Sequence, residues 1–214
     1  MPYGLWEDMR HGQGIVVEVY GADARRTRYP HLQMALGSSY AAMVNGALEE
    51  AFQAHSWANR RLLDFCKDLA AEQLAARNPA TKWSVLETFT HIVSADGYYL
   101  SSLTGQGRIV PAWNEDEDPA WSIDDLRERA AKVSARWDDY LKTDDDGDRL
   151  LVIDNGTFEC RAGVLVAQAL HHGDLHREQI CEVARVLGLE PPDLQTWEYA
   201  TDTGRARFLD ITGA

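Results

Sequence analysis

The spacing of apolar residues changes character near residue 43 of this 214-residue chain. From there on, four segments repeat apolar side chains every three or four positions, which is the period of a helix with one buried face. The first segment predicts a helix over about 44–76. This helix should end before Asn78-Pro79, because the residue that precedes a proline disfavours helical geometry. Its stripe consists of Leu48, Phe52, His55, Asn59, Leu62, Cys66 and Leu69.

Two further helices are predicted from their capping residues. Ser84, with Glu87 three residues later, matches a capping box, so a second helix should begin there. It runs to about Leu103 and stops at Gly105. Ser122 predicts the cap of a third helix, which extends to about residue 142 after a long loop.

The fourth helix is predicted over 162–187, closed by Gly188 at its carboxyl end. The pair Pro191-Pro192 prevents any continuation of that helix. The last stretch contains Trp197 and Tyr199, and we expect it to pack as a short tail across the other helices.

Two β-prone runs, 150–153 and 157–160, flank Asp154-Asn155-Gly156, which is typical of a tight hairpin turn. Together the elements predict an all-α fold. We expect a four-helix bundle with a long crossover between its second and third helices and a small β-hairpin before the fourth.

The segment 1–42 differs from the rest of the chain. It has no sustained helical period, and glycines and a proline interrupt it throughout; one short apolar run, Ile15-Val16-Val17, suggests a stray strand. We therefore expect two regions: a poorly ordered N-terminal extension over 1–42, and the bundle with its C-terminal tail over 43–214. An equally weighted alternative is that the start is misassigned and that Met43 is the native first residue.

Charge and composition exclude several classes of protein. The net charge of −13 repels phosphate backbones, so we expect no nucleic-acid partner. No run of 18 apolar residues occurs, so neither a transmembrane helix nor a membrane partner is predicted. The three cysteines, Cys66, Cys160 and Cys181, form no paired metal motif and indicate reduced thiols in a cytoplasmic protein.

The fourth helix carries the candidate chemistry. His172 and His176 are four residues apart, which places both imidazoles on one helix face, whereas His171 points elsewhere. Burying two imidazoles without polar partners is costly, and a metal ion that binds the neutral rings removes this cost. Gly173 follows His172 where zinc proteases have a glutamate, which argues against that class. The pair belongs to the core-facing stripe Leu165, Ala169, His172, His176, Gln179, Val183 and Val186.

A third ligand must come from another helix, and two histidines are candidates. His55 lies within the apolar stripe of the first helix, so periodicity favours it. His91 lies on a flanking stripe of the second helix with Ala95, Tyr98 and Ser102, which resembles the wall of a cavity. Geometry alone leaves both candidates open.

Three segments resemble a known family. Residues 172–180 are similar to the His-x-x-x-His-Arg-x-Gln signature of DinB/YfiT-like proteins, residues 83–92 to the second-helix motif of that family, and residues 56–63 to its first-helix motif. The resemblance covers about 44–189. It implies the ligand set His91, His172 and His176, a four-helix bundle and a tendency to form homodimers. Glu178 departs from the pattern, because a small residue is common there.

The resemblance also implies a function. Three histidine ligands leave open metal positions, as in catalytic zinc sites; zinc is the favoured metal, and nickel or iron would also accept imidazoles. We expect a metal-dependent S-transferase that activates a low-molecular-weight thiol, of the mycothiol or bacillithiol type, for attack on a small-molecule substrate. The alternatives are a metal-dependent hydrolase and a non-catalytic metal-binding module of the stress response. His55, Asn59 and Tyr98 are candidates for the cavity wall, and no further catalytic residue is predicted.

Overall fold

The computed structural model describes residues 30–80 and 83–209, and side chains from residue 46 onward. The chain divides into two compact units, residues 1–40 and 41–214. The bundle core and the candidate site belong to the second unit. The strand suggested at 15–17 lies outside the described residues.

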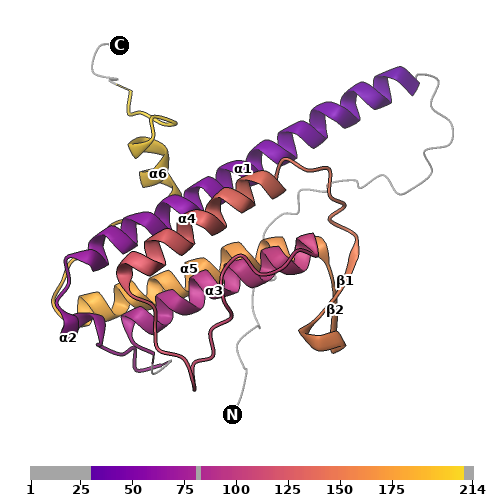
Figure 1. Ribbon diagram of the computed structural model, residues 1–214. Coiled ribbons are helices and arrows are strands. Elements are labelled where there is room, and N and C mark those ends of the chain that lie inside the picture. The colour runs from indigo at the N-terminus through magenta and orange to yellow at the C-terminus, as the bar shows by residue number, and fades with distance from the viewer. Residues whose placement is uncertain (1–29, 81–82, 210–214) are drawn as a thin grey trace, which may run out of the picture. The chain divides into compact units, whose positions relative to one another are not determined.

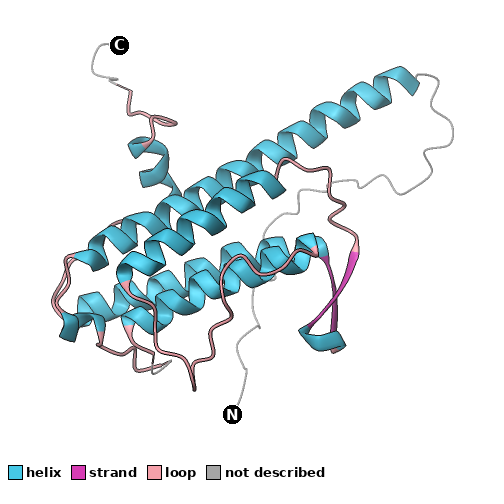
Figure 2. Cartoon of the chain, in the orientation of Figure 1, coloured by secondary structure: helices cyan, strands magenta, loops and turns pink. Residues whose placement is uncertain are grey.

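Long helices dominate the described chain, which confirms the predicted all-α class (Figures 1 and 2). Residues 105–122 form the long connection between the second and third of them, and α3 packs against both α4 and α5. The long helices are α1 (Pro30–Lys67), α3 (Val85–Thr104), α4 (Ile123–Tyr140) and α5 (Ala162–Val186), and the short ones are α2 (Ala71–Leu74) and α6 (Thr196–Asp202).

Side-chain hydrogen bonds join α1 to each of its long neighbours. His55 pairs with Asp96 of α3 at 3.0 Å. Ser134 of α4 donates to Ser56 at 2.9 Å, and a bond at 2.7 Å links Asn59 to α5. The helices also share an apolar core, whose largest fully buried side chains are Trp137, Phe52, Phe89, Leu62, Leu63, Ile92, Leu100, Leu126 and Ile180.

Helix ends follow the predicted caps. The Ser84 hydroxyl accepts from the Glu87 N–H at 3.1 Å, while the Glu87 carboxylate accepts from the Ser84 N–H at 2.6 Å. Gly105 ends α3 with a φ of 66°, a left-handed conformation that glycine adopts without strain. The Ser122 hydroxyl caps α4 by accepting from the Asp125 N–H at 3.2 Å.

The predicted bounds of the first helix were wrong at both ends. Helix α1 begins at Pro30, inside the segment predicted to be irregular, and proline suits a first helical position. The helix ends at Lys67 rather than near 76, because Ala70 adopts extended backbone and caps α2 instead. The chain must then turn back toward α3, and the Val85 N–H donates to the Ala76 carbonyl at 3.2 Å.

The predicted hairpin is present, with its second strand one residue later than expected. Strand β1 (Leu150–Ile153) pairs antiparallel with β2 (Phe158–Arg161). Asp154 and Asn155 take positive φ angles of 50° and 56° in the turn, a conformation that asparagine and aspartate tolerate better than most residues. Helix α5 starts directly after β2 (Figure 2).

The C-terminal tail packs through one of its two aromatic residues. Tyr199 is buried, and its hydroxyl donates to Glu50 of α1 at 2.8 Å. The Trp57 indole donates to Asp202 at 2.8 Å and so fixes the end of α6. Trp197, by contrast, is 78% exposed. Among the helices that the structure describes, none has both the length and the apolar character needed to cross a bilayer.

Candidate metal centre

Three histidines from two helices meet between α3 and α5. His91 comes from α3, and His172 and His176 come from successive turns of α5. One ring nitrogen of each lies within 4.8 Å of the others, close enough to hold one metal ion. His171 is exposed and does not belong to the cluster. The helical spacing of the pair and its alignment with His91 thus produce a three-nitrogen cradle.

Hydrogen bonds orient the rings of the cluster. The Nε2 atoms of His172 and His91 are 2.8 Å apart, so two potential ligand atoms converge on one point. The Nδ1–H of His176 donates to the Gln179 side-chain oxygen at 2.7 Å. This bond fixes the tautomer and leaves Nε2 of His176 with its lone pair, the form that a metal ion binds.

The electrostatics of the cluster favour neutral imidazoles. Burial, reinforced by His176, lowers the pKa of His91 to about 4. Burial, with His176 and His91, lowers the pKa of His172 to about 3. Burial also lowers the pKa of His176, against the opposing effect of the Gln179 hydrogen bond. Three neutral nitrogens suit a divalent ion, and His172 Nδ1 is a buried polar atom without a partner among the described residues.

Aromatic rings line the cluster. The Trp83 ring lies 4.5 Å from His91 and 5.8 Å from His176, measured between centroids. Trp113, from the α3–α4 connection, lies 6.4 Å from His91, and Tyr99 lies 5.7 Å from His172. The sequence drew attention to Trp83 only as part of a motif. Nothing in the sequence pattern singled out Trp113, which reaches the site through an irregular loop.

The structure brings His91, and not His55, to the histidine pair. His55 is buried outside the cluster, and its Nδ1 accepts from Arg177 at 3.3 Å. Asn59 joins the same network by accepting from Arg177 at 2.7 Å. The His55 ring packs so closely on Gly173 that an added Cβ there would lie 2.3 Å from its Cε1 atom. The periodicity that favoured His55 as a ligand instead identified a buried hydrogen-bonded group.

Tyr98, the third candidate for a cavity wall, lies at the hairpin. Its hydroxyl donates to the Asp154 carboxylate at 2.6 Å and accepts from the Asp154 N–H at 3.2 Å. The Arg108 guanidinium stacks on its ring at 4.9 Å. These residues line a hollow of about 450 Å³ against β1. The neighbouring Tyr99, rather than Tyr98, contacts a histidine of the cluster.

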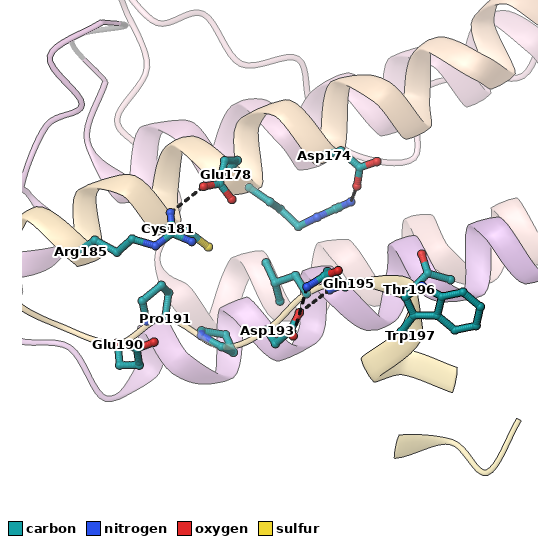
Figure 3. A pocket seen from close by; sticks show the side chains of 13 residues that line it. Asp174, Glu178, Cys181, Arg185, Glu190, Pro191, Asp193, Gln195, Thr196 and Trp197 are labelled. Carbon is teal, nitrogen blue, oxygen red and sulfur yellow. Dashed lines mark hydrogen bonds and ion pairs between the residues drawn. The ribbon is translucent and has the colours of Figure 1, made fainter. Parts of the chain in front are cut away.

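The residue that departs from the family pattern faces away from the histidines. Glu178 is exposed and accepts from Arg185 at 2.6 Å. The preceding residue, Arg177, is only 3% exposed and donates to Asp174 at 2.5 Å. These residues line a hollow of about 730 Å³ between α5 and the segment 190–197 (Figure 3). The departure at Glu178 therefore does not alter the histidine cluster.

Comparison with known proteins connects the chain that carries this site with a protein family. The model of the DinB family matches residues 43–206, which include all three histidines of the cluster. No curated protein matches the chain.

Proposed function

This chain belongs to the DinB family, and we propose that it is a divalent-metal-dependent enzyme that activates a low-molecular-weight thiol. One observation carries the proposal: ring nitrogens of His91, His172 and His176 converge within 4.8 Å. Nitrogen ligands of this kind suit zinc, and also nickel and iron. Zinc is the proposed metal.

The residues of the chain have distinct roles in this proposal. The three imidazoles would hold the ion, and Gln179 keeps the ring of His176 in the ligating tautomer. Trp83 and Trp113 form an aromatic wall beside His91. When bound, the metal supplies a Lewis acid that lowers the pKa of a thiol or water at the site.

Charge favours a thiolate as the fourth ligand, beside the three imidazoles. Among the described residues no carboxylate joins the cluster, so three neutral imidazoles would leave the double positive charge of a divalent ion uncompensated. An anionic sulfur would compensate part of this charge. In the proposed transfer, the sulfur forms a bond to an electrophilic carbon of a small substrate, and the leaving group departs with the bonding electron pair.

The metal site is tested first. Metal content of the purified protein and of the single variants His91→Ala, His172→Ala and His176→Ala should be measured by elemental analysis. We expect about one metal ion per chain, lost in each variant and retained in His171→Ala, the matched control on the exposed side of α5. Metal retained in all three cluster variants would contradict the assignment.

The reaction is tested on the metal-loaded protein. Mycothiol, bacillithiol and glutathione should each be offered with a chromogenic electrophile, and conjugate should be measured. Thiol-dependent turnover that His172→Ala abolishes and His171→Ala retains supports the transferase. Cleavage of esters or amides without a thiol favours the hydrolase, and stoichiometric metal with neither activity favours a non-catalytic module of the stress response.

The proposal also covers the oligomeric state of the protein and its cellular compartment. The family resemblance favours a homodimer, and the unpaired thiols Cys66, Cys160 and Cys181 suit the reducing cytoplasm. Light scattering during gel filtration would measure the mass in solution against 24.0 kDa for one chain. A mass of one chain at micromolar concentration would refute the dimer.

A further inference from the structure

The hairpin between α4 and α5 carries several exposed large apolar side chains. Leu150 and Val152 of β1 are 61% and 62% exposed, and Phe158 of β2 is 52% exposed. Within the part of the chain that the structure describes, the two strands pair only with each other, so each keeps one edge without a neighbouring strand. Such an edge presents a row of unpaired backbone N–H and C=O groups, to which a strand of another chain can bind.

The edge of β2 is the more accessible of the two. Strand β1 lies beside α3, where the Arg149 side chain donates to the Leu103 carbonyl at 2.9 Å and Tyr98 donates to Asp154 at 2.6 Å. Strand β2 packs mainly against β1, the turn and α5, and the hairpin projects from the end of the bundle (Figure 1). The edge of β2 is thus the better candidate for pairing with another molecule.

The hydrogen bonds of the hairpin show which backbone groups point out of this edge. The Ala162 N–H donates to the Arg149 carbonyl at 2.8 Å, and these two residues continue the register of the strands by one pair. Hydrogen-bonded pairs alternate with non-hydrogen-bonded pairs along an antiparallel ladder. Cys160, two residues before Ala162, therefore bonds to β1 as well, whereas the N–H and C=O groups of Glu159 and Arg161 point away from β1.

Strand β2 is complementary to a second copy of itself in one antiparallel register. Backbone bonds across the edge require that the outward residues, Glu159 and Arg161, oppose each other or themselves. A two-fold axis through either of these residues would set like charges opposite, which is destabilising. An axis through Cys160 instead sets Glu159 opposite Arg161 of the partner subunit, and the same favourable pair forms again across the axis.

The contacts that these two side chains already make leave them available. Arg161 lies 2.8 Å from Asp148, and the two side chains are 65% and 79% exposed. Exposed pairs of this kind contribute little stability, so Arg161 can exchange Asp148 for Glu159 of the partner subunit. Glu159 is itself exposed and forms no ion pair among the described residues.

We propose that two copies of this chain associate through β2, which pairs antiparallel with β2 of the partner subunit about an axis at Cys160. Each Glu159–Arg161 pair then exchanges both of its backbone hydrogen bonds across the axis, and the two hairpins form one continuous sheet. On the face that carries the ion pairs, the exposed side chains of Leu150 and Val152 flank them. The inference assigns an interface to the homodimer proposed above, on which it rests, and it does not depend on the metal centre.

Cys160 provides a direct test of the axis. The Cys160 residues of the two subunits would form a non-hydrogen-bonded pair with Cα atoms about 4.5 Å apart, within the range of about 4.4–6.8 Å in which a disulfide forms. The full chain should be treated with diamide, which takes up the two thiol hydrogens and is reduced to its hydrazine as the S–S bond forms. We expect a disulfide-linked dimer on a non-reducing gel, and none in Cys160→Ser, because Cys66 and Cys181 are buried.

A second cysteine position controls for chance collisions between exposed thiols. Phe158→Cys in a Cys160→Ser background places each thiol two residues from the axis, on the same face of β2 and at a more exposed position. The two Cα atoms would then lie about 14 Å apart along the paired strands, so this chain should not form a disulfide-linked dimer.

Charge reversal tests the ion pairs. Glu159→Arg sets like charges opposite in both pairs and should weaken dimerisation at least about tenfold in sedimentation equilibrium. Adding Arg161→Glu recreates both pairs with their signs exchanged and should restore the dimer to within about threefold of the native chain. Glu115→Arg makes the same change of charge in the exposed α3–α4 connection and should leave dimerisation unaltered.

Several outcomes would overturn the interface. A dimer that gives no Cys160 cross-link, or that is unaffected by Glu159→Arg, forms through another surface. A Phe158→Cys chain that cross-links as well as the native chain shows that the thiols meet by collision only. The mass of a single chain in solution refutes the interface and the homodimer together, while metal content and thiol-dependent turnover still decide the proposed reaction.

Discussion

Replacing Gly173 by alanine tests how tightly α1 and α5 pack beside the metal centre. The added Cβ would lie 2.3 Å from Cε1 of His55 and 3.0 Å from Nη1 of Arg177. Neither group can move freely, because His55 is bonded to Asp96 and Arg177 donates to three residues. The substitution therefore forces a shift in a buried network.

The sign of the change in unfolding free energy depends on a stabilising contribution and an opposing, destabilising one. Glycine to alanine inside a helix stabilises by about 1 kcal/mol through backbone entropy alone. Overpacking costs about 1–3 kcal/mol, and a lost hydrogen bond to a charged group costs about 1.5–3 kcal/mol. The two costs together exceed the entropy gain, so we expect Gly173→Ala to lower the free energy of unfolding by about 1.5–5 kcal/mol.

Urea denaturation in the presence of a chelator would measure this change. Gly46→Ala in α1 is the matched control, because an added Cβ there meets nothing within 4 Å, and it should stabilise by about 1 kcal/mol. In a His55→Ala background, Gly173→Ala should become neutral or stabilising. The reasoning fails if Gly173→Ala stabilises the chain as much as Gly46→Ala does.

Three further predictions concern other parts of the molecule. Burial, reinforced by Cys181, raises the pKa of the Cys66 thiol to about 12, so the native thiol stays protonated while the unfolded one ionises near pH 9. The stability that this thiol contributes is complete below about pH 9 and is lost as the pH rises toward 12; unfolding curves of Cys66→Ala should accordingly show a flatter decline over this window. Gln179→Ala should weaken zinc binding by about 10–100-fold in a chelator competition, since it frees the ring of His176, and unchanged affinity would remove Gln179 from the site. Ser84→Ala should cost about 1 kcal/mol in thermal or urea unfolding through loss of the cap of α3, and a neutral result would show that the cap contributes little.

Local sequence rules were sufficient to predict much of the structure of this protein. The pair His172 and His176, the exposed position of His171 and the caps at Ser84 and Gly188 each depend on a few neighbouring residues of one helix. The helical period of 3.6 residues fixes the angle at which each side chain leaves the helix axis, and this angle does not depend on the rest of the chain. Those predictions therefore needed no tertiary information.

Contacts between elements were decided by the tertiary structure. Periodicity placed His55 and His91 on usable faces and favoured His55, and only the family resemblance selected His91, which α3 brings to the cluster. The same packing places Tyr99 and Trp113 beside the histidines. It also ends α1 at Lys67, where the chain turns toward α3 although no glycine or proline stops the helix there. The period of a helix does not fix its rotation relative to its neighbours or the path of a loop, and these set which side chains meet.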